Sequence, residues 1–180
     1  MARRVVCIVL AFLLWLPVAV AAESHSDLDD IPIPAYPLTS DELGLFTKVV
    51  CAESRGQTRG ERRAVIHVVL NRVNRPTWWG NSVISVLLAK SQFAKPSDPM
   101  CQDEFPPPPA GVERWSPYLV ELNRRIIQEI REDIVASAAG QIPDPTNGAV
   151  YFHARRLGTV WPRLSEVRVP SNWTHRFFRD

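Results

Sequence analysis

The sequence predicts a single α+β domain that is mainly helical, with a small β-sheet late in the chain. Apolar residues recur at helical spacing in several segments before Gly140. After the turn-forming run 144–148, short runs of β-branched and aromatic residues replace them. The length beyond the N-terminal segment suits one domain. Helices followed by late, short strands are typical of the α+β class.

Residues 1–22 are predicted to be a signal peptide. Arg3 and Arg4 precede an apolar run that ends at Leu16, and Ala19-Val20-Ala21 gives the small-residue pattern of a cleavage site. The run is shorter than the roughly 20 apolar residues that cross a bilayer, although an uncleaved anchor is the alternative. We therefore expect an exported protein, periplasmic or extracellular, with no membrane contact after cleavage.

Residues 23–40 are predicted to be a linker, and the folded domain is expected to span 41–180. The linker is acidic and interrupted by prolines, which favours an extended chain. The run Ser40-Asp41-Glu42 then supplies a polar cap and acidic residues, as in the first turn of a helix.

The charge balance and the cysteines limit the partners of the chain. It has 21 Lys+Arg and 19 Asp+Glu, and loss of Arg3 and Arg4 with the signal leaves equal numbers. This balance gives no reason to expect nucleic acid or an anionic membrane as a partner. No Cys-x-x-Cys pair or His/Cys cluster indicates a metal site, and no cofactor is predicted.

Cys51 and Cys101 are the cysteines that remain after removal of the signal. Two cysteines in an oxidising compartment can form a disulfide, but the sequence does not show whether they come within reach. If formed, the bridge would tie an irregular segment to the first helix.

Three helices are expected in the first half of the domain, at 41–54, 61–73 and 82–90, each from apolar residues at helical spacing. The second is apolar on most sides and is expected to be buried. Segment 95–111 contains four consecutive prolines, which fit neither a helix interior nor a paired strand. It is therefore interpreted as a surface loop or a lid.

The longest helix is expected to start at Ser116-Pro117, with proline at its first position, and to run to about Ala139 before Gly140. Its apolar side chains repeat at spacings of three and four: Leu119, Leu122, Ile126, Ile130 and Ile134. Short strands are expected at 149–153, 166–169 and 176–179.

Glu53 is the residue most indicative of chemistry. It continues the apolar stripe of Phe46 and Val50 when the helix is projected at about 100° per residue. Burial disfavours a charged carboxylate, which suits a general acid that must hold its proton near neutral pH. The alternative is a buried Glu paired with a nearby arginine such as Arg55 or Arg59.

Several short motifs follow one another along the domain. They are Ala52-Glu53-Ser54-Arg55-Gly56-Gln57, Gly60–Val73, Ser91-Gln92-Phe93, Asp144-Pro145-Thr146-Asn147-Gly148-Ala149, Phe152-His153 and His175-Arg176-Phe177-Phe178. In this order they resemble the Glu-Ala-Arg-Gly-Glu, helical, Gln-Phe-Ser, Asp-Pro-Thr-Gly-Gly-Ala, late His and His-x-Phe-Tyr elements of the SleB-type cell-wall hydrolases, a family that includes spore-cortex-lytic enzymes. The resemblance spans nearly the whole domain.

The resemblance implies a lysozyme-like fold and cleavage of peptidoglycan between N-acetylmuramic acid and N-acetylglucosamine. The family glutamate corresponds to Glu53. Members can act as lytic transglycosylases, in which the 6-hydroxyl of the muramic acid closes an anhydro ring and one carboxyl group serves as acid and base. A two-carboxylate hydrolase needs a second acid.

Gln57 stands where the family has its second Glu, and it cannot ionise. This departure favours the one-acid route without excluding hydrolysis. Other acids remain possible partners, although Asp144, before a proline turn, is more often a turn cap. They are Glu61, Asp98, Asp103 and Asp144.

Six residues are predicted to contact the glycan: Gln92, Phe93, Tyr151, Phe152, His153 and His175. The Gln92 amide would bond an acetamido group and Phe93 would stack on a sugar, or they form a polar helix end and a core ring. Tyr151 and Phe152 alternate on a strand, so one ring would be a sugar platform and the other core. His153 either contacts substrate, orients Glu53 or is structural, and His175 is equally open.

The tryptophans Trp78, Trp79 and Trp161 are either core residues or carbohydrate-stacking surfaces, and His67 in the buried helix is interpreted as structural. Two other functions stay open. One is a non-catalytic peptidoglycan-binding or scaffold protein of the same fold, which Gln57 would suit. The other is a peptidase or amidase with Cys51 as nucleophile, although residues two apart on a helix do not face each other.

Overall fold

The computed structural model describes residues 36–158 and 161–180 of the chain. The predicted signal peptide, residues 1–22, and the predicted linker up to residue 35 lie outside these ranges. Within the described ranges, none of the helices has the length and apolar content of a membrane span.

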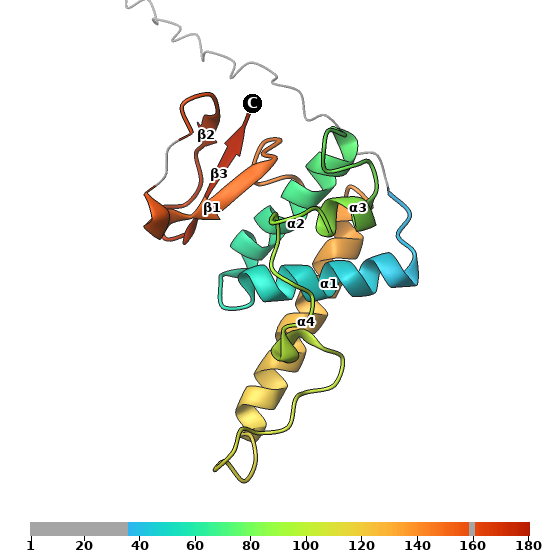
Figure 1. Cartoon of the computed structure of the whole chain (residues 1–180), viewed down its shortest axis with the longest axis vertical. Coiled ribbons are helices and arrows are strands. Elements are labelled where there is room, and N and C mark those ends of the chain that lie inside the picture. Colours follow the sequence, from blue (N-terminus) through green and yellow to red (C-terminus); the bar gives the residue numbers. More distant parts are fainter. Residues whose placement is uncertain (1–35, 159–160) are drawn as a thin grey trace, which may run out of the picture. The chain divides into compact units, whose positions relative to one another are not determined.

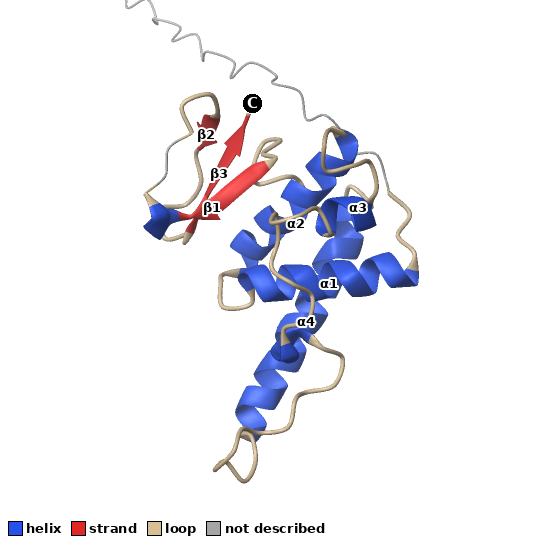
Figure 2. Ribbon diagram, viewed as in Figure 1, coloured by secondary structure: helices blue, strands red, loops and turns tan. Residues whose placement is uncertain are grey.

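Helices fill the first part of the described chain and a small antiparallel sheet the last (Figures 1 and 2). In chain order the elements are α1 (Ser40–Ser54), α2 (Arg59–Asn74), α3 (Val83–Leu87), the 3-10 helix η1 (Pro99–Cys101), α4 (Pro117–Ala138), β1 (Tyr151–Ala154), the 3-10 helix η2 (Arg155–Leu157), β2 (Ser165–Val167) and β3 (His175–Arg179). This arrangement confirms the predicted α+β class, mainly helical with a small late sheet. The likeness to lysozyme stays a prediction.

The end of the predicted linker belongs to the folded domain. The backbone N–H of Tyr36 donates to the carbonyl of Ala138 at 2.8 Å, and its hydroxyl donates to Glu42 at 3.0 Å. Thr39 and Glu42 form a capping box, each side chain accepting the other's backbone N–H. The first helix therefore begins at Ser40, and packed structure begins before residue 41.

Helix α2 is the centre of the core, as its apolar sequence predicts. Its side chains are buried on nearly every side, and Val65, Ile66, Val69 and Leu70 are at most 1% exposed. Helices α1, α3 and α4 all pack against it. Truncation of one such side chain to alanine is expected to cost about 2–5 kcal/mol, because the close-packed neighbours cannot fill the cavity.

The segment between α3 and α4 is anchored at several points rather than free. Helix α3 ends at Leu87, earlier than predicted, because the following turn places Ser91 at a positive φ of 60°. Cys101 forms a disulfide with Cys51 of α1, with a Cα–Cα distance of 5.7 Å. The Asn123 amide on α4 donates to the carbonyl of Met100 at 2.9 Å. These contacts hold the segment against α1 and α4.

The sheet has the order β1-β3-β2, with both pairs antiparallel. Directly opposed residues of an antiparallel pair point to the same face, and neighbours along a strand point to opposite faces. The register pairs Phe152 with Phe177 and Tyr151 with Phe178. One face therefore carries Phe152, His175 and Phe177, and the other carries Tyr151, His153 and Phe178.

Loss of the Cys51–Cys101 bridge should destabilise the domain. The bridge closes a loop of 50 residues, and the loss of unfolded-chain entropy in such a loop corresponds to about 4 kcal/mol. We expect the Cys51→Ser/Cys101→Ser variant to have a free energy of unfolding that is lower than that of the wild type by a comparable amount, seen as a lower urea midpoint. A reductant should lower the midpoint of the wild type and leave that of the variant unchanged. An unchanged midpoint in the variant would contradict this prediction.

Candidate functional site

Glu53 lies in the last turn of α1 and is partly buried. Its Oε1 accepts a hydrogen bond from the backbone N–H of Ala94, in the segment that follows α3. Burial raises the pKa of the Glu53 carboxyl, and the Ala94 N–H and the charge of His175 oppose this rise without cancelling it. The carboxyl therefore keeps its proton to a higher pH than an exposed Glu, as a general acid must.

The neighbouring arginines are engaged elsewhere. Arg59 makes a bidentate pair with Asp133, both N···O distances being 2.9 Å, and Arg55 lies 3.7 Å from a carboxylate oxygen of Asp98. Among the described residues, Glu53 forms no salt bridge with Lys or Arg. The interpretation of Glu53 as half of a buried ion pair is therefore wrong for this structure.

Gln92 and Phe93 come from the turn after α3 and lie next to Ala94, the partner of Glu53. The Phe93 ring centre is 6.0 Å from that of Phe152 on β1. The Gln92 side chain is partly exposed and makes no hydrogen bond to the residues that the structure describes. Its amide is therefore available to an outside group.

His175 extends the same group from β3. Its ring centre is 5.4 Å from that of Phe152, in an edge-to-face arrangement, and its charge acts on Glu53. Four of the seven residues predicted for the glycan site, Glu53, Phe93, Phe152 and His175, thus gather on one side of the sheet. Gln92 is adjacent to them in the chain.

Tyr151 and His153 point to the other face of β1. The His153 ring stacks on Phe178 at 5.2 Å and meets the edge of Trp161 at 4.9 Å, and its Nδ1 lies 2.9 Å from its neighbour's carbonyl, Ala154 O. Tyr151 contacts Trp79 and Trp161. The structure thus does not bring His153 to Glu53, so it does not orient that carboxyl.

Glu61 is a component that sequence reasoning did not single out. It is 1% exposed, and its Oε1 accepts from the backbone N–H and hydroxyl of Thr174 and from the backbone N–H and Nδ1 of His175, at 2.7–2.8 Å. In sequence, Thr58-x-x-Glu61 fits a capping box. Thr58 does accept the Glu61 N–H, but the Glu61 carboxylate turns to β3 instead of back to the cap.

Three motif residues turn out to build the frame of the site. Asp144 accepts four hydrogen bonds, from the backbone and hydroxyl of Thr146, from Gly148 N and from the Asn71 amide, so it caps the turn as its place before a proline predicts. Asn71 and Arg72 donate to the carbonyls of Ala149 and Val150. These side-chain bonds explain why β1 begins at Tyr151 and not at Ala149.

The buried Arg72 side chain also sits among aromatic rings. Its guanidinium lies 5.0 Å from the ring centres of both Trp79 and Phe93, and burial lowers its pKa to about 10. Trp79 is 4% exposed and donates to the carbonyl of Arg72 at 3.0 Å, which makes it a core residue, whereas Trp78 is exposed. Arg72 thus holds Phe93 in place beside the site.

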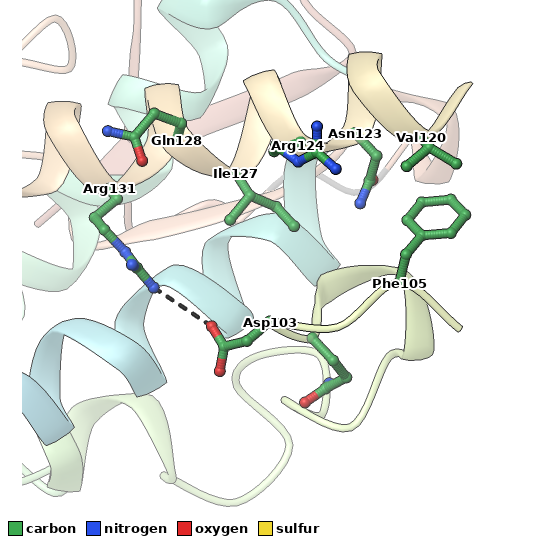
Figure 3. Close-up of a pocket in the computed structure, with 9 residues that line it drawn as sticks. Asp103, Phe105, Val120, Asn123, Arg124, Ile127, Gln128 and Arg131 are labelled. Carbon is green, nitrogen blue, oxygen red and sulfur yellow. Dashed lines mark hydrogen bonds and ion pairs between the residues drawn. The ribbon is translucent and has the colours of Figure 1, made fainter. Parts of the chain in front are cut away.

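A separate pocket lies between α4 and residues 102–105 (Figure 3). Its volume is about 300 Å³, and a contact of 3.5 Å between Arg131 and Asp103 closes one side. Its lining includes none of Glu53, Gln92, Phe93, Phe152 or His175.

The sulfur of Cys51 is bonded to Cys101, so Cys51 has no thiol to act as a nucleophile.

The fold and the site define a class: a small α+β domain with a proton-holding carboxyl beside aromatic side chains. A model of the family described as Cell Wall Hydrolase matches residues 56–178, and the chain belongs to this family. No curated protein and no solved structure matches the chain. Family membership implies a peptidoglycan substrate and an extracytoplasmic protein. The match begins three residues after Glu53. The role of Glu53 is therefore argued from the geometry of the site.

Glu53→Gln should stabilise the fold at high pH. The folded-state pKa of Glu53 is raised, so its contribution to stability is present below the unfolded-state pKa and is lost as the pH rises through the folded-state pKa. Gln fills the same space and does not ionise. We expect the Tm of the variant to exceed that of the wild type by more at pH 8 than at pH 4, by calorimetry. The exposed substitution Glu113→Gln should show no such pH dependence; an equal response of both variants would contradict the prediction.

Proposed function

We propose that this protein cleaves the glycan strands of peptidoglycan between N-acetylmuramic acid and N-acetylglucosamine, with Glu53 as the acid and base. The observation that carries the proposal is the partly buried Glu53 carboxyl, whose pKa is raised and which has no cationic Lys or Arg partner among the described residues. Such a group can protonate the oxygen that leaves the glycosidic bond.

The reaction that these residues favour is lytic transglycosylation. Glu53 gives its proton to the leaving oxygen as the bond from that oxygen to C1 of the muramic acid breaks. The 6-hydroxyl of the same sugar then bonds to C1, and its proton passes to the Glu53 carboxylate, which restores the acid. No water is consumed and one carboxyl group suffices.

The one-carboxyl route is supported because the residues considered for a second acid either do not ionise or already bind other partners. Gln57 does not ionise, Glu61 is committed to Thr174 and His175, and Asp144 is a turn cap. Asp98 caps η1 and lies next to Arg55. A hydrolase with two carboxylates would need a second one across the scissile bond, about 5–10 Å from the first.

The rings beside Glu53 suit a sugar. The partly buried rings of Phe93 and Phe152 lie 6.0 Å apart, and Phe93 precedes Ala94, whose N–H donates to Glu53. Pyranose rings pack against such apolar rings while their hydroxyls stay polar. The Gln92 amide offers a donor and an acceptor to an acetamido group. We propose these three residues as substrate contacts, whereas Tyr151 and His153 would contact substrate only on the other face of β1.

Glu53→Gln should strongly slow glycan cleavage. Loss of a general acid lowers the rate by about 10²–10⁴-fold, and Glu113→Gln, an exposed change of the same chemistry, should keep wild-type activity. The assay is digestion of purified sacculi with mass spectrometry of the products. Anhydromuramic ends would support transglycosylation and reducing ends hydrolysis. Binding to sacculi with no released muropeptides would instead identify a non-catalytic peptidoglycan-binding protein.

Gln92→Ala should weaken substrate use without destabilising the fold. Its side chain makes no hydrogen bond to the described residues, so its loss leaves the free protein intact. A lost hydrogen bond of about 0.5–1.5 kcal/mol corresponds to a roughly 2- to 10-fold lower kcat/KM on soluble glycan oligomers. A drop in Tm together with unchanged kcat/KM would show that Gln92 serves the fold and not the substrate.

A further inference from the structure

The Glu61–His175 pair points to a function beyond packing. We infer that Glu61 and His175 act together as positioning residues for Glu53: Glu61 fixes the orientation and tautomer of the His175 imidazole, and His175 sets the charge balance at the Glu53 carboxyl. This inference rests on the proposed function for its catalytic meaning, but its structural part can be tested without any activity.

Glu61 holds His175 by two bonds to a single oxygen. The backbone N–H of His175 lies 2.8 Å and its Nδ1 2.7 Å from Glu61 Oε1, and both Glu61 and His175 are buried, at 1% and 8% exposure. A carboxylate oxygen can only accept, so Nδ1 carries the hydrogen and donates it. The neutral ring then has its lone pair on Nε2, as in the acid–imidazole pairs that orient a catalytic histidine.

The rings around His175 leave it little freedom. Phe152 meets its edge at 5.4 Å and Phe177 lies 6.4 Å away, both on the same sheet face. Phe152 also packs against Phe93, whose neighbour Ala94 donates to Glu53. A series of contacts through Phe152, Phe93 and Ala94 thus connects the imidazole to the Glu53 carboxyl.

His175 is the charged group that acts on Glu53. When protonated it favours the ionised carboxylate and lowers the pKa of Glu53, against the rise caused by burial. Arginines of α2, η2 and β3 hydrogen-bond to other groups: Arg62 to the Gln57 carbonyl and Glu129, Arg72 to the Val150 carbonyl, Arg155 to the Trp173 carbonyl and Arg176 to Glu166.

Two opposite effects therefore act on the pKa of the Glu53 carboxyl, burial and the charge of His175. Burial raises the pKa of Glu53, which favours its step as an acid and disfavours its next step as a base. The charge of the His175 imidazole acts in the opposite direction to burial and lowers the pKa of Glu53. Glu61 Oε1 lies 2.7 Å from His175 Nδ1 and fixes the position from which the ring acts.

The first experiment is NMR of the wild-type chain with labelled imidazole nitrogens. We expect the neutral ring of His175 to carry its hydrogen on Nδ1. In Glu53→Gln the ring-nitrogen resonances of His175 should shift, because the charged carboxyl with which the imidazole interacts is gone and such coupling is reciprocal. His153, of similar burial on the opposite face, is the matched control and should not move. An Nε2–H tautomer, or an unmoved His175, would overturn the inference even if the enzyme is active.

The second experiment is the pH profile of kcat/KM on soluble glycan oligomers. The alkaline limb reports the loss of the Glu53 proton. It should move to higher pH in His175→Asn, because the positive charge that lowers the Glu53 pKa is removed. A purely structural pair would lower activity at all pH values and leave the limb in place, which would contradict the inference. If no variant, wild type included, cleaves glycan, the proposed function fails while the NMR result still decides the pairing.

Discussion

A single buried oxygen, Oε1 of Glu61, ties the helical core to the sheet. It accepts four hydrogen bonds from Thr174 and His175 at the start of β3. Three strands of this length are marginal on their own, so they need an attachment to the helices. The same helix makes a second attachment through Asn71 and Arg72, which hold the start of β1. Helix α2 is therefore both the centre of the core and the support of the sheet.

This support places the candidate site between elements that are distant in the chain. Glu53 comes from the end of α1, its Ala94 partner from the turn after α3, and Phe152 and His175 from the sheet. The disulfide fixes the segment after α3 to α1 close to Glu53. A carboxyl held in this way keeps its position and environment before substrate arrives, which reduces the reorganisation needed in a reaction.

The family and the geometry answer different parts of the functional question. Membership of the Cell Wall Hydrolase family gives peptidoglycan as the substrate. The proposal of a one-carboxyl mechanism comes from the side chains: Gln57 does not ionise, and Glu61 and Asp144 are bound to structural partners. The buried pair of Glu61 with His175 offers a way to moderate that one carboxyl where a second is missing.

The sequence by itself determined the helices, the late strands to within a few residues, the buried character of α2 and the place of Glu53 on the apolar side of α1. Periodicity carries this information because it is local. Only the tertiary structure decided that Arg55 and Arg59 turn away from Glu53, that His175 and not His153 faces it, and that Glu61 reaches β3 instead of capping its own helix. Those choices depend on contacts between residues up to 114 positions apart, and a pattern along the chain does not encode which of two equivalent partners a side chain will meet.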